Sequence, residues 1–316
     1  MSVRRRVGER DGRPLHSDVL GVLEEVTDTT LFVRRKDGTL VDIPVDQVTA
    51  ARRVSSLPPR HRPRSAADWL DVDIERVAWQ GWPGLEQERL GAWVLRAAGG
   101  FTGRANSALP LGDPGVPRAS AIAHVRDFYA LRGLRPRFQV PTPVAADLDG
   151  HLADLGWDLV DLVDVLTADV ERVLTGTPPV EGVPEVVLDA EPDDAWLQQY
   201  HYRGGPLPEQ ARDVLLAGTG PVFASVRDAH GDALAIARGA VGGGWVGITA
   251  VEVDERARRR GLGTHVMREL LGWAGRQGAR HAYLQVAHDN LPAQSVYGRM
   301  GFVRHHGYHY RLAPRA

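Results

Sequence analysis

The sequence contains no cysteine among its 316 residues. A chain without thiols forms no disulfide bond and cannot use a thiolate as a nucleophile. It also lacks a Cys-x-x-Cys redox motif, a Gly-x-Ser-x-Gly nucleophile elbow and a Walker phosphate loop. This composition suits a reducing compartment, so we expect a cytoplasmic protein.

Long apolar segments are also missing. The most apolar stretch, LVDLVDVLTADV at 159–170, has an aspartate every few residues. No run approaches the roughly 20 residues that span a bilayer. The N-terminal MSVRRRVGERDGR is charged and no apolar segment follows it, so it is not a secretory signal. We therefore expect no membrane partner.

Neither sign of charge is in excess. The chain has 38 basic and 40 acidic residues, for a formal net charge of -2. This balance gives no overall basic field that would attract nucleic acid. A local basic patch on the N-terminal region is still compatible with it.

The first segment is rich in short strands. DVLGVLEEV, TLFVRRKDG and TLVDIPVDQV are β-rich and partly alternating, and Asp37-Gly38 between the last two is a hairpin signal for a two-residue turn. Several short strands in this length predict a small SH3-like β-barrel over residues 1–57. The proline-rich 58–65 predicts a linker.

The remaining chain reads as two similar mixed α/β halves, 66–180 and 181–316. AIAHVRDFYALRGLRPRFQV (121–140) and VMRELLGWAGRQGARHAYLQV (266–286) both predict a helix, a glycine stop and a strand. Each strand leads to a helix that ends in LGW or MGF. Gly133 matches Gly278, and Gln139 matches Gln285. Such an ordered series of matches favours a tandem duplication.

An anion site is predicted in the second half. Strand VGITAVEV (246–253) runs into DERARRRGLG, and a helix follows with Leu262, Val266, Leu270 and Ala274 on one face. The first amides of a helix lack internal partners and lie at its positive end, where phosphate binds readily. Because Gly261 and Gly263 have no side chain, their backbone amides can approach a phosphate closely.

These residues resemble the GNAT (Gcn5-related N-acetyltransferase) superfamily. Its Arg/Gln-x-x-Gly-x-Gly/Ala motif is matched from Arg258 to Gly263. Its second signature, Asn-x-x-Ala-x-x-x-Tyr-x-x-x-Gly-Phe, is matched from Asn290 to Phe302. The resemblance implies acetyl-CoA as cofactor, with pantetheine along Val251 and Val253. The other implied cofactor-binding residues are Arg258, Arg259, Arg260, Gly261, Leu262, Gly263, Thr264, Asn290 and Tyr297.

The chemistry implied by this resemblance is direct attack of an amine on the acetyl thioester. Tyr297, whose phenol has an unperturbed pKa of about 10, is the candidate acid for the leaving thiolate; the alternative is a packing tyrosine. Glu252 is the candidate base if it points into the cleft, and otherwise an exposed strand residue.

The first half has no glycine motif, because its equivalent stretch, LGDPGVPRAS, is interrupted by prolines. We expect this half not to bind coenzyme A. Arg104 and Asn106 either help form the acceptor site between the halves or make hydrogen bonds at a strand end. In RHHGYHY (304–310), strand alternation places His305 and His309 on one face and His306 on the other. We predict no metal site there, and His306 is a candidate acceptor contact.

Over its whole length the chain resembles an actinobacterial acetyltransferase family that joins an SH3-like domain to a tandem GNAT region. The resemblance rests on GAWVLRAAGGFTGRANSALPLGDP, the terminal HHGYHYR and the leading small barrel. It implies an N-acetyltransferase whose acceptor amine belongs to a small molecule or a protein. The alternatives are a coenzyme-A-binding regulator that acts through its barrel, and a transferase of longer acyl groups.

Overall fold

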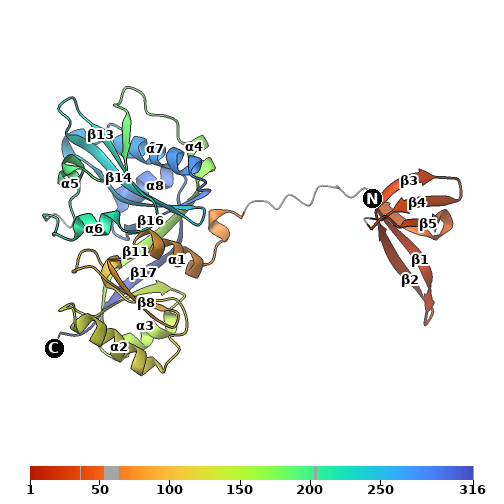
Figure 1. Ribbon diagram of the computed structural model, residues 1–316, viewed down its shortest axis with the longest axis horizontal. Coiled ribbons are helices and arrows are strands. Elements are labelled where there is room, and N and C mark those ends of the chain that lie inside the picture. Colours follow the sequence, from red (N-terminus) through yellow and green to blue (C-terminus); the bar gives the residue numbers. More distant parts are fainter. Residues whose placement is uncertain (36, 53–63, 203–204, 316) are drawn as a thin grey trace. The chain divides into compact units, whose positions relative to one another are not determined.

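The computed structural model describes residues 1–35, 37–52, 64–202 and 205–315. The chain forms two compact units, Met1–Arg64 and Ser65–Ala316 (Figure 1). Most of the predicted linker, 58–65, lies outside the described residues. No helix among the described residues has both the length and the apolar character needed to cross a membrane.

The first unit consists of two three-stranded sheets, β2-β1-β6 and β3-β4-β5. Val3, Val19, Val33 and Ile43 come from both sheets and form one fully buried core. The strands are β1 (Ser2–Arg10), β2 (Arg13–Leu20), β3 (Val22–Val26), β4 (Thr30–Arg34), β5 (Leu40–Pro44) and β6 (Val48–Arg52).

The predicted SH3-like barrel is not confirmed. Among the described residues, no ladder joins the two sheets into a closed barrel. The chain passes between the sheets at Gly21 and again at the short helix η1 (Val45–Gln47), so neither change of sheet continues a ladder. The predicted hairpin between β4 and β5 is present, with Gly38 at φ 86°. The Arg35 amide donates to the Thr39 carbonyl, so three residues separate this pair instead of the predicted two.

The second unit is built on an eight-stranded mixed sheet of order β10-β17-β11-β16-β15-β14-β13-β12. A separate small sheet contains β7 (Glu86–Leu90), β8 (Trp93–Ala97) and β9 (Leu109–Pro110). The strands of the large sheet are β10 (Arg137–Thr142), β11 (Asp158–Asp169), β12 (Val186–Asp189), β13 (Pro221–Arg227), β14 (Ala233–Gly242), β15 (Trp245–Val253), β16 (His281–Ala287) and β17 (Val303–Leu312).

The two predicted halves exchange their last strands. The last strand of the second half, β17, pairs with β10 and β11 of the first half. The last strand of the first half, β11, pairs in turn with β16 of the second. One continuous sheet therefore passes through both halves.

Helices cover both faces of this sheet. On β16, Ala282 and Leu284 pack in the core that contains α7, whereas Tyr283 between them packs with Ile74 of α1. Because neighbouring strand residues point to opposite faces, α7 and α1 lie on opposite faces of the sheet. The helices are α1 (Asp71–Gly81), α2 (Arg118–Ala130), α3 (Ala146–Asp154), α4 (Val170–Gly176), α5 (Asp194–Gln199), α6 (Ala211–Leu216), α7 (Leu262–Arg276) and α8 (Leu291–Arg299).

Matching elements carry matching residues, as the duplication predicts. Gly133 and Gly278 both adopt positive φ after the corresponding helices α2 and α7. Arg96 of β8 and Arg238 of β14 are both fully buried. The Arg238 guanidinium donates to the carbonyls of Leu215, Ala217 and Gly81. Burial lowers its pKa to about 10, so it still carries its charge at neutral pH.

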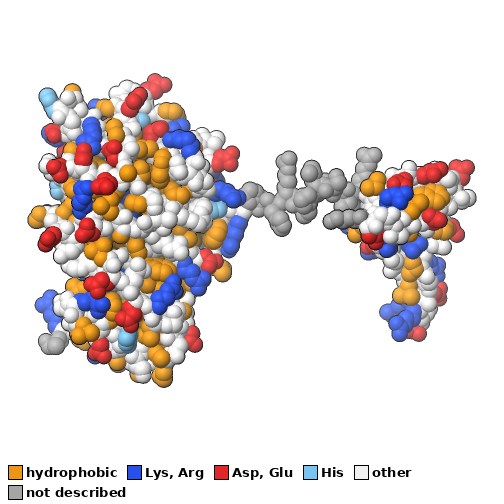
Figure 2. All heavy atoms as spheres, in the orientation of Figure 1, with side chains coloured by type: hydrophobic (Ala, Val, Ile, Leu, Met, Phe, Trp, Pro, Cys, Tyr) orange, Lys and Arg blue, Asp and Glu red, His pale blue; other side chains and the backbone are white. Residues whose placement is uncertain are grey.

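Surface charge is mixed. Figure 2 shows acidic and basic side chains interspersed over the visible face of the second unit. This distribution agrees with the net charge of -2.

We expect the second unit to fold alone. Asp169 accepts hydrogen bonds from Ser65 Oγ (3.1 Å) and from the Ala66 amide (2.8 Å), so a chain that begins at Ser65 keeps this anchor. Its melting temperature should lie within about 2 °C of the same transition in the full chain. For a unit of this size, such a shift corresponds to a change of less than about 1 kcal/mol in the free energy of unfolding. Calorimetry checks this, and a truncated protein that is insoluble or melts much earlier would contradict it.

Candidate active site

Strands β15 and β16 run parallel and then separate. Their pairing extends from Trp245↔His281 to Ile248↔Leu284 and stops there. On its other edge β15 continues to pair with β14 as far as Val253. A bulge at Ala250, with φ 52°, bends β15 at this point. The edge of β15 that faces β16 is therefore left unpaired after Ile248.

Polar atoms without partners lie beside this opening. Thr249 Oγ1 and Gln285 Nε2 are buried and make no hydrogen bond to any described residue. A buried polar group without a partner is costly. An extended ligand with amide groups would satisfy a free strand edge by pairing with it as an added strand. This part of the structure therefore fits a strand-like ligand.

A tight turn connects β15 to α7. The short helix η4 (Glu255–Ala257) follows β15, and then Arg259 (φ 63°) and Gly261 (φ 79°) adopt left-handed conformations. Gly261 is the N-cap of α7 and provides no side-chain cap. The first amides of α7 are thus available to an anion at the positive end of the helix.

Charge and space at this turn favour an anion. Arg259 and Arg260 are exposed and form no ion pair within the described part of the chain, whereas Arg258 is paired with Glu255 at 3.2 Å. A Cβ on Gly263 would lie 3.3 Å from Cγ2 of Val253. The predicted cofactor residues 258–264 therefore form one cationic turn at the end of β15.

The second predicted signature begins at the N-cap of α8. The Asn290 side chain accepts a hydrogen bond from the Ala293 amide at 3.2 Å, as expected for an N-cap. Tyr297 packs beside Ala293 and Val296 against the core under α7, with its ring centroid 6.2 Å from that of Phe302. Burial raises the pKa of Tyr297 to about 12, so its phenol stays protonated at neutral pH.

Glu252 points away from α7. Its neighbours Val251 and Val253 pack in the core under α7, so the Glu252 side chain projects from the other face of β15. One carboxylate oxygen accepts a hydrogen bond from the His201 amide (2.8 Å), and the other lies 2.7 Å from His201 Nδ1. The adjacent Tyr200 lines a cavity on this face.

This cavity has a volume of about 460 Å³ and lies where the two halves meet. Arg104 contributes to its wall, donates to Gln285 Oε1 at 2.8 Å and stacks over Trp82 with 4.9 Å to the ring centroid. Exposed Asp161 and Asp289 add negative charge. The remaining lining residues are Thr102, Gly103, Leu162, Val163, Tyr200, Tyr202, Ala287, His288, Tyr308 and Tyr310.

Two predicted acceptor contacts lie elsewhere. Asn106 accepts from the amides of Ala98 and Gly100 and donates to two carbonyls, so its amide holds the 98–102 loop in place. His306 is 4% exposed and its Nε2 lies 2.8 Å from Glu75 Oε1. Neither side chain lines this cavity, and their predicted contact with the acceptor stays a prediction.

Sequence reasoning missed Tyr200 and Tyr202 of the cavity, and His201 between them. Tyr200 and Tyr202 come from the QQYHY segment (198–202), which carries no motif. The sequence singled out Gln285 only as the residue that matches Gln139 in the internal repeat, and not as a cavity residue. These residues meet because β11 and β17 are exchanged between the halves, and the local sequence does not encode this pairing.

A mixed sheet whose parallel strands diverge beside a glycine-rich helix start has the architecture of GNAT acyltransferases. A family model described as "Probable histone acetyltransferase Rv0428c C-terminal" matches residues 72–311. The chain therefore belongs to this family of GNAT N-acetyltransferases, and it is an acyltransferase enzyme.

Individual relatives agree with this assignment. The chain is 33% identical over 324 residues to "Probable histone acetyltransferase Rv0428c" of Mycobacterium tuberculosis, covering 98% of this chain and 94% of the relative. It is 31% identical over 242 residues to "Uncharacterized N-acetyltransferase YobR" of Bacillus subtilis, covering 76% and 97%.

Solved structures share the fold. A GCN5-related N-acetyltransferase from Kribbella flavida aligns with a TM-score of 0.57 at 18% identity, over 78% of this chain and 96% of that one. A tandem GNAT protein from the clavulanic acid biosynthesis pathway aligns with a TM-score of 0.52 at 16% identity, over 66% and 76%. The tandem arrangement predicted from the repeats thus has a structural precedent.

Gly263→Glu should abolish the binding of acetyl-CoA. The new side chain would begin 3.3 Å from Val253 and would place a carboxylate at the turn where pyrophosphate is expected. Titration calorimetry measures the loss. Gly150→Glu is the matched control, since a Cβ at Gly150 of α3 meets no atom within 4 Å. Undiminished binding by Gly263→Glu would remove this turn from the cofactor site.

Proposed function

We propose that this N-acetyltransferase transfers an acetyl group from acetyl-CoA to a primary amine by direct attack. The observation that carries the proposal is the divergence of β15 and β16 directly beside the glycine turn that begins α7. The unpaired strand edge and the cationic turn suit the two ends of one long ligand, an amide-bearing arm and a pyrophosphate.

The residues present fit acetyl-CoA. The unpaired edge near Val251 and Val253, with the unpartnered Thr249 hydroxyl, would hold the pantetheine amides. The turn from Arg258 to Thr264 would hold the pyrophosphate, and by resemblance Asn290, the N-cap of α8, would also contact the cofactor. The bound cofactor supplies an activated thioester, and the protein supplies position, a base and an acid.

Glu252 is proposed as the base. Its carboxylate projects from the face of β15 opposite α7 and binds His201, which follows Tyr200 of the cavity wall; Glu252 does not itself line the cavity. His201 holds both carboxylate oxygens in a fixed orientation. Glu252 would remove a proton from the acceptor ammonium or amine, directly or through a water molecule.

Tyr297 is proposed as the acid. Burial raises its pKa to about 12, so the phenol holds its proton at neutral pH. Its hydroxyl donates to no residue that the structure describes, and it is therefore available to a ligand. Tyr297 would give its proton to the sulfur as the carbon–sulfur bond breaks.

The acceptor is proposed to be a cationic amine that enters the cavity between the halves. Exposed Asp161 and Asp289 attract a positive charge, and the tyrosines give apolar walls that carry hydroxyl groups. The Mycobacterium tuberculosis relative is named a probable histone acetyltransferase. We therefore favour the lysine amine of a protein over a small-molecule amine.

Tyr297→Phe tests the proposed acid. The variant keeps the ring, so acetyl-CoA affinity should change little, while turnover should fall roughly 10²–10⁴-fold because the donor acts only as charge develops on sulfur. A free-thiol assay of coenzyme A release from screened amines measures this. Tyr129→Phe removes a buried hydroxyl in the first half, where it donates to the Arg96 carbonyl, and should leave turnover unchanged.

Two results would contradict parts of this proposal. Wild-type turnover by Tyr297→Phe would leave the tyrosine a packing residue. Tight binding of acetyl-CoA by the unaltered protein, without thiol release for any amine or for longer acyl-CoA donors, would favour a coenzyme-A-binding regulator.

Glu252→Gln tests the proposed base. The amide keeps an oxygen for the His201 backbone but cannot accept a proton, so kcat/KM should fall roughly 10²–10⁴-fold near pH 7. The deficit should shrink as pH rises, because more of the free amine is then already deprotonated. A pH profile of both proteins measures it. A deficit that is the same at every pH would assign Glu252 a positioning role instead.

A further inference from the structure

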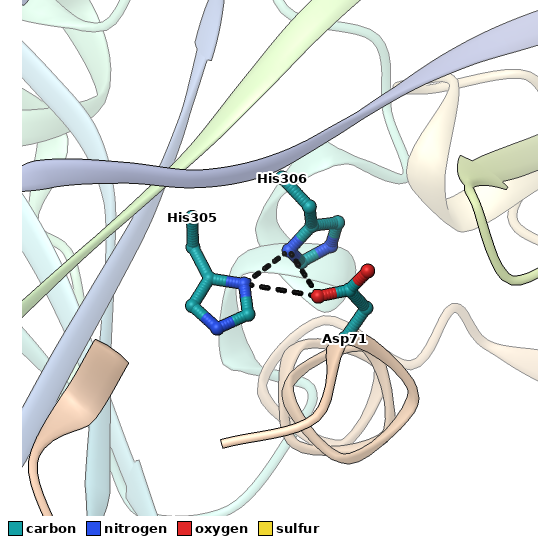
Figure 3. Close-up of side chains that lie close together, drawn as sticks. All are labelled: Asp71, His305 and His306. Atoms are coloured by element: carbon teal, nitrogen blue, oxygen red, sulfur yellow. Dashed lines mark hydrogen bonds and ion pairs between the residues drawn. The ribbon is translucent and has the colours of Figure 1, made fainter. Parts of the chain in front are cut away.

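A second cluster of polar side chains lies outside the cavity. Asp71 begins α1, while His305 and His306 lie on β17, and the three side chains point toward one another (Figure 3). The two Nδ1 atoms are 3.0 Å apart, and Asp71 Oδ1 lies 3.2 Å from Nδ1 of His305 and 3.9 Å from Nδ1 of His306. None of the three lines the cavity.

A β-bulge brings the two histidines together. In the pairing of β11 with β17, Val165 lies opposite His306 and Leu166 lies opposite Arg304, so His305 is an extra residue. A bulge re-aims side chains that would otherwise alternate. The expectation that His305 and His306 point to opposite faces is therefore wrong. Asp71 adds a third converging group that the sequence did not reveal.

The outer nitrogen of each ring has an acceptor. His305 Nε2 lies 3.0 Å from the Trp69 carbonyl oxygen, and a carbonyl can only accept, so this nitrogen carries a hydrogen. His306 Nε2 lies 2.8 Å from the Glu75 carboxylate, to which it donates. In the neutral rings, both Nδ1 atoms then present lone pairs. Metal-binding histidines are oriented in this way by a carbonyl or carboxylate behind the ring.

Three acceptor atoms thus face a common point. A triangle with sides of 3.0, 3.2 and 3.9 Å has a circumscribed circle of about 2.0 Å radius, the length of a zinc bond to nitrogen or oxygen. A proton on one ring is the competing way to join these atoms, and titration with zinc distinguishes the two.

We propose that Asp71, His305 and His306 bind a zinc ion that joins the start of α1 to β17. Two imidazoles and one carboxylate form a three-ligand set that suits zinc, with the fourth position left to water. The ligands are 234 residues apart in sequence, from the first helix and the last strand of the second unit. Because they lie outside the cavity, the ion has a structural role.

Zinc binding by the full-length, untagged protein tests the proposal. After chelator treatment, titration with zinc chloride in a calorimeter should show one tight site. Asp71→Asn and His305→Gln should each weaken it roughly 100-fold or more, since removing a ligand costs at least as much as removing a second-shell partner. His288→Gln is the matched control, because His288 also contacts an aspartate, Asp164, at 2.9 Å.

Thermal unfolding provides a second readout that does not depend on activity. Zinc at about 100 times its Kd should raise the melting temperature of the unaltered protein by roughly 5 °C or more. Neither ligand variant should gain this increase, and both should melt cooperatively without metal.

Three outcomes would overturn the site: no tight stoichiometric binding, affinity retained in both ligand variants, or equal loss in His288→Gln. A ligand variant that does not fold is replaced by the other, since Asp71 and His305 come from different elements.

Discussion

The exchange of final strands between the two halves is the constraint on which the rest of the second unit depends. Because β17 lies between β10 and β11, and β11 lies between β16 and β17, neither half completes its sheet alone. The exchange places Arg104 of the first half beside Gln285 of the second, and brings Asp161 and Asp289 into the wall of the same cavity. It also carries His305 and His306 back to α1, at the beginning of the unit. The cavity and the proposed zinc site both follow from this one topological feature.

Features encoded over a few residues could be predicted from the sequence. Leu262, Val266, Leu270 and Ala274 are all buried on one face of α7, and Asn290 caps α8, because a helix period and a capping side chain are local properties. The bulges at Ala250 and His305 could not be read in this way, since each depends on the register of a partner strand distant in sequence. The prediction of an SH3-like barrel was not confirmed for a related reason: strand content predicts strands, whereas closure of a barrel depends on which strand edges pair.

Buried polar side chains hold α1 against the sheet. Glu75 is 1% exposed and lies within 2.8 Å of both His306 Nε2 and Gln139 Nε2. Gln139 accepts in turn from the fully buried Arg96, which also donates to Ser107. Removing an ion from water costs several kcal/mol, so each buried charge in this hydrogen-bond network requires its partners. The network fixes the orientation of Glu75, and Glu75 fixes the ring of His306 whose other nitrogen faces Asp71.

The two halves differ at the turn to which the proposed function assigns pyrophosphate. In the second half, Arg259 and Gly261 adopt left-handed conformations, and the first amides of α7 have no side-chain cap. In the first half, Pro117 is the N-cap of α2, and the preceding stretch contains Pro114 in place of a glycine-rich turn. The first half lacks this turn, yet it keeps the strand and loop that carry Arg104. Under the proposed function, duplication would allow one copy to hold the donor while the other shapes the acceptor cavity, and the exchanged strands would bring the two functions to the same sheet.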